Sequence, residues 1–171
     1  MLNEEGYKTY GELLRSELIT AMGCTEPIAI AYAGALARKV LGREPDKLLL
    51  ACSGNIVKNV KGVTVPNSGG RRGIEIAALL GVCGGDAHRR LAVLESVTDD
   101  TRARAVALLE AGICTTSLIE GTDNLVVQVT ARAGVDEAFV EIRGTHTNVT
   151  RMEHNGEDLL RDGGAQEVCA P

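Results

Sequence analysis

The sequence predicts an α/β chain of the α+β type. An α-rich N-terminal part with one or more short strands is followed by a small domain that combines a helix with a mainly antiparallel sheet. Apolar residues of the first half recur at helical spacing between glycines, whereas those from Leu125 onward recur at every second position. The 171 residues are 44% hydrophobic but include only four aromatic residues beside 20 glycines. We therefore expect a core of Ala, Val, Leu and Ile, with backbones in close approach at Gly and Ala.

Helix start and stop signals order the first half of the chain. Thr25 is a suitable N-cap, Glu26 and Pro27 favour a first helical turn, and Gly42 is a suitable C-terminal stop. The expected elements are a helix over 11–22, a helix from 25 to 41, a strand over 47–52, a short helix over 56–60, a Gly-rich loop over 62–73, a helix over 74–82, a helix from a cap at Asp86 to Val97, and a helix that begins at Thr98 and ends at Gly112.

Strands dominate the second half. Apolar residues alternate over 125–133 and again over 138–142, and a third strand is expected over 148–154. Asn155-Gly156 is a strong hairpin signal that leads into 157–160. We expect three parts: 1–97, the α-rich segment with the three loops described below; 98–160, a small α/β domain with β-hairpins; and 161–171, a disordered tail.

Composition excludes two classes of partner. The net charge is −5, the basic residues are scattered, and aromatic side chains that could stack on bases are nearly absent, so no nucleic acid is expected. No apolar run reaches the length of a membrane-spanning helix, so no membrane is expected either. The first residues are acidic and polar, unlike a signal peptide, which favours the cytoplasm.

Cys24 has the most unusual setting of the five cysteines. It directly precedes a predicted helix N-terminus, where backbone N–H groups and the helix dipole favour a thiolate, the form that a metal or a nucleophilic reaction needs. The alternative is a buried turn residue. The odd count and the absence of a CxxC pair argue against a disulfide framework and against a self-contained zinc site.

A second candidate segment follows the strand over 47–52. Ser53, Gly54 and Asn55 place short polar groups and free amides at a sheet end, where open α/β folds bind ligands. Lys58 adds a charge that could bind a carboxylate, and Asn59 follows it. The alternative is an ordinary strand-to-helix turn that Ser53 or Asn55 caps.

The Gly-rich loop over 66–73 is a third candidate. Gly69 and Gly70 precede a helix, and a glycine loop in that position can cradle an anion. The loop matches neither a P-loop nor GxGxxG, so nucleotide binding is a weak inference. The alternative is a flexible connector with two solvated arginines, Arg71 and Arg72.

His146 lies between two predicted strands, with Thr147 and Asn148 after it. A histidine flanked by hydroxyl groups could transfer a proton or donate a hydrogen bond. A lone histidine at a strand junction is more often structural.

These segments together resemble the L-cysteine desulfidase family, which is related to the α-chain part of iron–sulfur-dependent L-serine dehydratases. The resemblance runs from about residue 10 to 156. It rests on GCTEPIAIA, SGNIVKNVKGVTVP, the Gly-Gly pair followed by GIEIAALLG, and THTNV.

The resemblance implies an oxygen-sensitive cytoplasmic lyase that converts L-cysteine and water to pyruvate, ammonia and sulfide. A four-iron four-sulfur cluster, held by three cysteines, would act on the substrate while a base removes the α-proton. By this resemblance Cys24 matches a cluster ligand, and Lys58 and His146 are candidate catalytic residues. The substrate-binding candidates are Ser53, Gly54, Asn55, Asn59, Gly69, Gly70, Thr147 and Asn148.

The chain departs from the family in two respects. Arg71 and Arg72 follow the glycines where relatives tend to have smaller or apolar residues. Family members also continue into a further helical domain that supplies the other cluster cysteines, and the four remaining cysteines of this chain do not match those positions. The implied partners are therefore an amino-acid substrate and a C-terminal domain or second chain, with a homo-oligomer possible.

Three functions remain open from the sequence. The first is the N-terminal part of an L-cysteine desulfidase, inactive alone because the cluster would be absent or incomplete. The second is the equivalent part of an L-serine dehydratase. The third is a non-catalytic amino-acid-binding or assembly module with the same fold.

Overall fold

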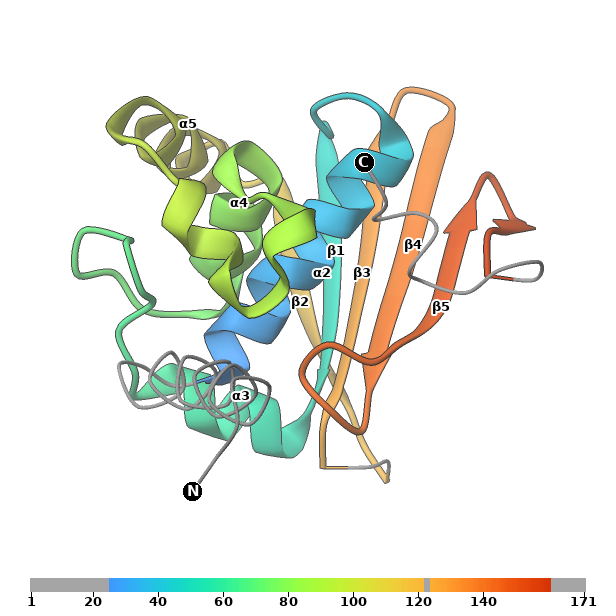
Figure 1. Ribbon diagram of the computed structural model, residues 1–171, viewed down its shortest axis with the longest axis horizontal. Coiled ribbons are helices and arrows are strands. Elements are labelled where there is room, and N and C mark those ends of the chain that lie inside the picture. The colour runs from blue at the N-terminus through green and yellow to red at the C-terminus, as the bar shows by residue number, and fades with distance from the viewer. Residues whose placement is uncertain (1–24, 122–123, 161–171) are drawn as a thin grey trace, which may run out of the picture.

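The computed structural model describes residues 25–121 and 124–160 and shows an α+β fold (Figure 1). Its elements in chain order are α2 (Thr25–Leu41), β1 (Lys47–Ser53), α3 (Gly54–Lys61), α4 (Ile74–Gly84), the 3₁₀ segment η1 (Ala87–Ser96), α5 (Asp99–Glu110), β2 (Cys114–Ile119), β3 (Val126–Ala133), β4 (Asp136–Arg143), β5 (Val149–His154) and β6 (Glu157–Asp158). The helix expected over 11–22, Cys24 and the tail over 161–171 lie outside the described residues.

Six strands form one mixed sheet in the order β2-β1-β3-β4-β5-β6. The pair β1–β2 is parallel, and every other neighbouring pair is antiparallel. The expectation of a mainly antiparallel sheet is therefore confirmed. Strands from both sides of the expected boundary near residue 97 pair in this sheet, because β1 lies between β2 and β3.

Helices cover one face of the sheet (Figure 1). Helix α2 packs against β3 and β4, and α4 packs on the other side of α2. A helix enclosed on both sides must be apolar all round, which explains the long run of Ala and Ile in α2. On the sheet side, the alternating residues of β1 and β3 point into the core; Leu48, Leu50, Val127 and Val129 are buried.

Two glycines allow α2 and α4 to approach closely, as the composition predicts. A Cβ atom on Gly34 would lie 2.5 Å from the Ala78 carbonyl oxygen. One on Gly81 would lie 2.7 Å from the carbonyl carbon of Ala31 and still closer to its oxygen. No side chain fits at either crossing, so glycine is required by contact between the helices and not by backbone torsion.

Most of the predicted elements are confirmed within a few residues, but one prediction needs correction and one strand was not predicted. The expected helix after Asp86 is the 3₁₀ segment η1, interrupted at Arg90, although Asp86 does cap it by accepting from the His88 N–H. Strand β2 was not expected at all. Helix α5 starts next to Thr98, as predicted, and Thr98 is its N-cap in a reciprocal capping box with Thr101.

No helix among the described residues is both long enough and apolar enough to cross a membrane.

Candidate functional site

His146 lies against the start of α2, so the GCTEP and THTN segments meet although 121 residues separate them. Its Nε2 atom is 2.9 Å from the Thr25 hydroxyl oxygen and 3.9 Å from Oε1 of Glu26. The His146 side chain is 31% exposed and that of Glu26 is 18% exposed. The ring is therefore held by neighbours yet remains accessible to a small molecule.

The β4–β5 connection positions His146. Gly144 adopts a positive φ of 87° and donates its N–H to the Leu125 carbonyl. The Asn148 side chain donates to the Arg143 carbonyl at 2.8 Å, and the backbone N–H of Asn148 donates to the Thr145 carbonyl at 3.2 Å. Asn148 thus stabilises this turn through its side chain and its backbone. Thr147 is half-buried beside it.

Ser53, at the end of β1, lies at the same end of the sheet as His146. The register connects them: Cys52 pairs with Val127, and Val127 pairs with Ile142 at the end of β4. With β3 between them, β1 and β4 are about 10 Å apart. The ends of β1 and β4 and the start of α2 therefore border one region (Figure 1).

The hydroxyl of Ser53 is already engaged. It donates to the Asn124 carbonyl at 2.8 Å and accepts from the Val126 N–H at 3.1 Å, and the residue is 1% exposed. Ser53 occupies the N-cap position of α3, but its side chain makes no capping hydrogen bond. Its bonds instead join the end of β1 to the start of β3.

Gly54 and Asn55 form the first turn of α3 and line a hollow of about 300 Å³. The other lining residues come from the end of β2 and the segment after it: Leu118, Ile119, Glu120, Gly121 and Asn124. Lys58 is exposed and Asn59 is half-buried on the same helix. The predicted Ser53–Asn59 segment therefore splits, with Ser53 in a structural role and Asn55 facing a hollow.

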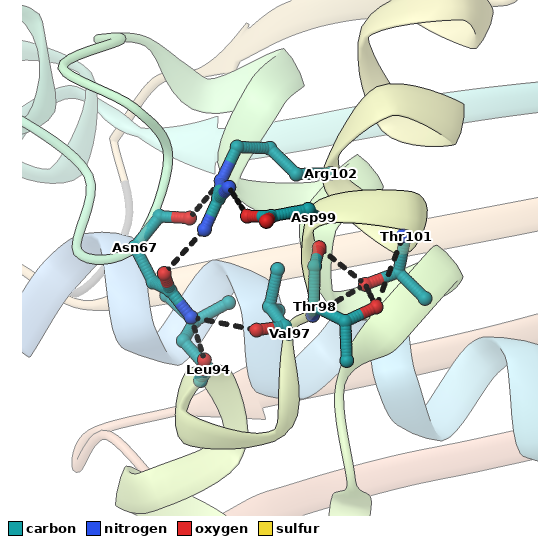
Figure 2. Close-up of polar contacts among 7 residues, drawn as sticks. All are labelled: Asn67, Leu94, Val97, Thr98, Asp99, Thr101 and Arg102. Atoms are coloured by element: carbon teal, nitrogen blue, oxygen red, sulfur yellow. Dashed lines mark hydrogen bonds and ion pairs between the residues drawn. The ribbon is translucent and has the colours of Figure 1, made fainter.

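Asn67 ties the Gly-rich loop to η1 and α5 (Figure 2). Its side-chain nitrogen donates to the Leu94 and Val97 carbonyls, each at 3.0 Å. Arg102 donates to both the backbone oxygen and the side-chain oxygen of Asn67, at 2.9 and 2.6 Å, and pairs with Asp99 at 2.7 Å. These hydrogen bonds fix the Gly-rich loop to its neighbours, so the loop is not the flexible connector that was the alternative from the sequence.

Gly69 and Gly70 are exposed, with φ values of 74° and 89°. A Cβ atom on Gly69 would lie 3.5 Å from Arg102, which places this glycine toward α5. Within residues 25–121 and 124–160, neither glycine forms a hydrogen bond with His146. The structure thus brings His146 together with the GCTEP segment but not with the Gly-rich loop.

Three cysteines lie among the described residues, and burial disfavours their thiolates. Burial raises the pKa of Cys52 and that of Cys114 to about 12, and the negative charge of Glu75 adds to both shifts. Burial is also the main cause that raises the pKa of Cys83 to about 11. Cys52 matches the prediction of a small buried hydrophobe, whereas Cys83 and Cys114 are only partly buried against the core. No group of three or more His, Cys, Asp or Glu side chains in the described part of the chain could hold a metal ion.

Thr25 and Glu26 were not named as site residues from the sequence, where both were assigned to the helix start. The available signal was their polarity in a helix whose next eleven residues, 27–37, are all buried. Two polar side chains at the first turn of a buried helix can accept hydrogen bonds from its free backbone N–H groups, or they can face a functional site. The contact with His146 favours the second role.

The chain is similar to proteins named UPF0597. It is 48% identical to one from Finegoldia magna over 156 residues, 91% of this chain and 37% of the relative. It is 45% identical to one from Lachnoclostridium phytofermentans, over 88% of this chain and 36% of the relative. It is 40% identical to one from Treponema denticola, over 99% of this chain and 39% of the relative. No protein-family model matches the chain. The chain therefore spans between 36% and 39% of the length of these curated relatives, whose shared name states no activity.

Proposed function

We propose that this chain is the N-terminal part of an iron–sulfur-dependent amino-acid lyase that eliminates sulfide from L-cysteine. The observation that carries the proposal is the contact of His146 with Thr25 and Glu26, which joins two of the four segments that carry the family resemblance. A substrate at the end of the sheet would have the imidazole beside it. Removal of the α-proton by a base, followed by departure of the β-sulfur, is the reaction that such a site must promote.

The role of His146 in this proposal is that of a general base. The imidazole accepts the α-proton at a ring nitrogen, and the electron pair of the C–H bond forms the double bond as sulfide leaves. Water then hydrolyses the resulting enamine, through its imine, to pyruvate and ammonia. The hydrogen bond with Thr25 orients the ring through Nε2, with the Glu26 carboxylate 3.9 Å from the same atom, and the opposite nitrogen, Nδ1, then serves the substrate.

The iron–sulfur cluster is the part of the proposal that the described residues do not fit by themselves. Cluster ligands are thiolates, whereas Cys52, Cys83 and Cys114 are thiols of raised pKa that form no ligand set. Cys24 lies outside the described residues, next to Thr25. The remaining ligands would belong to the portion of the longer relatives that this chain does not match.

Anaerobic reconstitution with iron and sulfide tests the proposal. The chain alone should stay colourless and release no sulfide or pyruvate from L-cysteine, because a single ligand position cannot hold a cluster. Co-expression with the remaining portion of a UPF0597 protein should give a brown complex with lyase activity on L-cysteine. A stable brown product that is active without that portion would overturn the division of ligands proposed above. If the brown complex favours L-serine, the L-serine dehydratase alternative is correct.

A second candidate is a non-catalytic amino-acid-binding or assembly module, and the engaged hydroxyl of Ser53 favours the assembly role. Its only O–H is donated to the Asn124 carbonyl, so one predicted substrate ligand has no free donor. Titration calorimetry with L-cysteine and L-serine separates the two functions. Binding that survives Cys24→Ala but is lost with His146→Ala supports the module.

A further inference from the structure

In one stretch of this acidic chain, every charged side chain is basic. Residues 47–74 contain five Lys or Arg and no Asp or Glu, whereas the other 143 residues contain 13 basic and 23 acidic residues, a net charge of −10. Four of the five cations fall within fifteen consecutive positions on α3 and the loop after it. We call this set the basic surface; its members are Lys58, Lys61, Arg71 and Arg72.

Among the residues that the structure describes, no carboxylate neutralises the basic surface. All four side chains belong to exposed residues, and none forms an ion pair within residues 25–121 and 124–160. Seven arginines elsewhere in the described chain do pair with carboxylates: Arg43, Arg89, Arg102, Arg104, Arg132, Arg143 and Arg151. The basic surface therefore combines four cations that are close in the sequence with a lack of ion pairs to any described carboxylate.

The scaffold beneath these cations is fixed. Lys58 and Lys61 are one helical turn apart on α3, opposite a side that is buried through Ile56 and Val60. In the loop, Thr64 bridges to Arg72 as in an antiparallel pair. Ser68 is 1% exposed and both donates to and accepts from the Arg71 backbone, at 3.0 and 2.9 Å. With Asn67 anchored as in Figure 2, the loop presents its two arginines on an ordered frame.

We propose that the basic surface binds an acidic segment of a protein partner. Acidic side chains opposite the four cations would gain Coulomb energy and speed association, and a fixed scaffold lowers the entropy lost on binding. The proposal goes beyond the lyase reaction, because it concerns which macromolecule this part of the chain meets.

The exposure of all four cations favours an extended partner over a small anion. A small anion is bound in a hollow that removes it from water, and the hollows at Asn55 and at Phe139 include none of the four residues. An extended acidic segment can engage all four at once, so that weak contacts add.

A nucleic acid fits less well than an acidic peptide. The segment 47–74 has no aromatic residue on which bases could stack. A polyanion longer than the basic surface would also meet the net charge of −10 on the rest of the chain.

Fluorescence anisotropy with a labelled Glu-rich peptide tests the proposal, and the same peptide with Gln in place of Glu serves as the uncharged probe. The test variant combines Lys58→Gln, Lys61→Gln, Arg71→Gln and Arg72→Gln. The matched control removes the same total charge at Lys39→Gln, Lys47→Gln, Arg132→Gln and Arg151→Gln. Far-UV circular dichroism confirms that both variants fold.

The intact chain should bind the Glu-rich peptide and not the Gln peptide, and binding should weaken at least about tenfold between about 0.05 M and about 0.5 M salt. The test variant should lose about tenfold to hundredfold in affinity, from four exposed ion pairs, while the control changes less than about threefold. Absence of binding, equal losses in both variants, or tighter binding of a single-stranded oligonucleotide of the same charge would each overturn the proposal.

Discussion

Replacement of Asn67 should destabilise the chain more than any other single change to its exposed loops. In Asn67→Ala the carbonyls of Leu94 and Val97 each lose a donor at 3.0 Å, and the Arg102 guanidinium loses an acceptor at 2.6 Å. A lost neutral hydrogen bond costs about 1 kcal/mol and a bond to a charged group somewhat more. Asn67 is also at φ 59°, where an alanine costs about 1 kcal/mol beyond asparagine.

The two neutral hydrogen bonds and the backbone contribution sum to about 3 kcal/mol, and the bond to the partly exposed Arg102 side chain adds little. The free energy of unfolding, from urea titrations followed by far-UV circular dichroism, measures the loss, and the thermal midpoint should fall by about 6–12 °C. Asn67→Gly relieves the backbone term, so it should lose about 1 kcal/mol less than Asn67→Ala.

Asn55→Ala is the matched control, because Asn55 is exposed on α3 and its side chain makes no hydrogen bond to any other described residue. It should change the free energy of unfolding by less than about 0.5 kcal/mol. The reasoning would be refuted if Asn67→Ala were as mild as this control. It would also be refuted if the glycine variant were as damaging as the alanine variant.

Three further changes test other parts of the structure. Gly81→Ala should cost at least about 3 kcal/mol or prevent folding, because its methyl group would overlap the Ala31 backbone; a melting temperature close to wild type would contradict the close helix crossing. Cys52 in the folded chain should react with iodoacetamide at pH 8 about a thousandfold more slowly than in urea, because a pKa of about 12 leaves little thiolate. The free energy of unfolding should fall from about pH 9 toward pH 12, because the thiol of the unfolded chain ionises first. Equal alkylation rates in the folded and unfolded chain would count against this. Thr98→Ala should lower the free energy of unfolding by about 1 kcal/mol through loss of the capping box, and Thr98→Ser, which keeps the hydroxyl, should restore most of it.

The helices and antiparallel strands were predictable because their signals are local. Gly42, at φ 83°, ends α2 where the sequence predicts a stop, and the alternation in 125–133 matches the burial pattern of β3. The 3₁₀ form of η1 was not predictable, because it depends on non-helical backbone torsions at Arg90 (φ 50°, ψ −110°). The residue type at this position does not indicate such torsions.

Strand β2 escaped prediction because its sequence lacks the pattern of a buried strand. Thr115, Ser117 and Leu118 are exposed at the sheet edge, so no apolar alternation marks the segment. Its place beside β1 is set by parallel pairing of residues 66 positions apart, such as Leu48 with Cys114. Pairing over that separation leaves no local signal.

The candidate site was predictable as a set of motifs but not as a geometry. His146 was named from its flanking residues, whereas its contact with Thr25 depends on α2 crossing the sheet to reach the β4–β5 turn. Ser53 shows the converse: its position at a strand end was foreseen, but its bonds to Asn124 and Val126 depend on how β3 begins.

The central claim is that His146, held by Thr25 and Glu26, removes the substrate α-proton. It is tested most directly by the rate of pyruvate release from L-cysteine, measured anaerobically with this chain reconstituted together with the remaining portion of a UPF0597 protein. His146→Ala should reduce kcat by about 10²- to 10⁴-fold with the cluster absorbance unchanged, which is the range for loss of a general base. Undiminished kcat in His146→Ala, with the cluster intact, would contradict the claim.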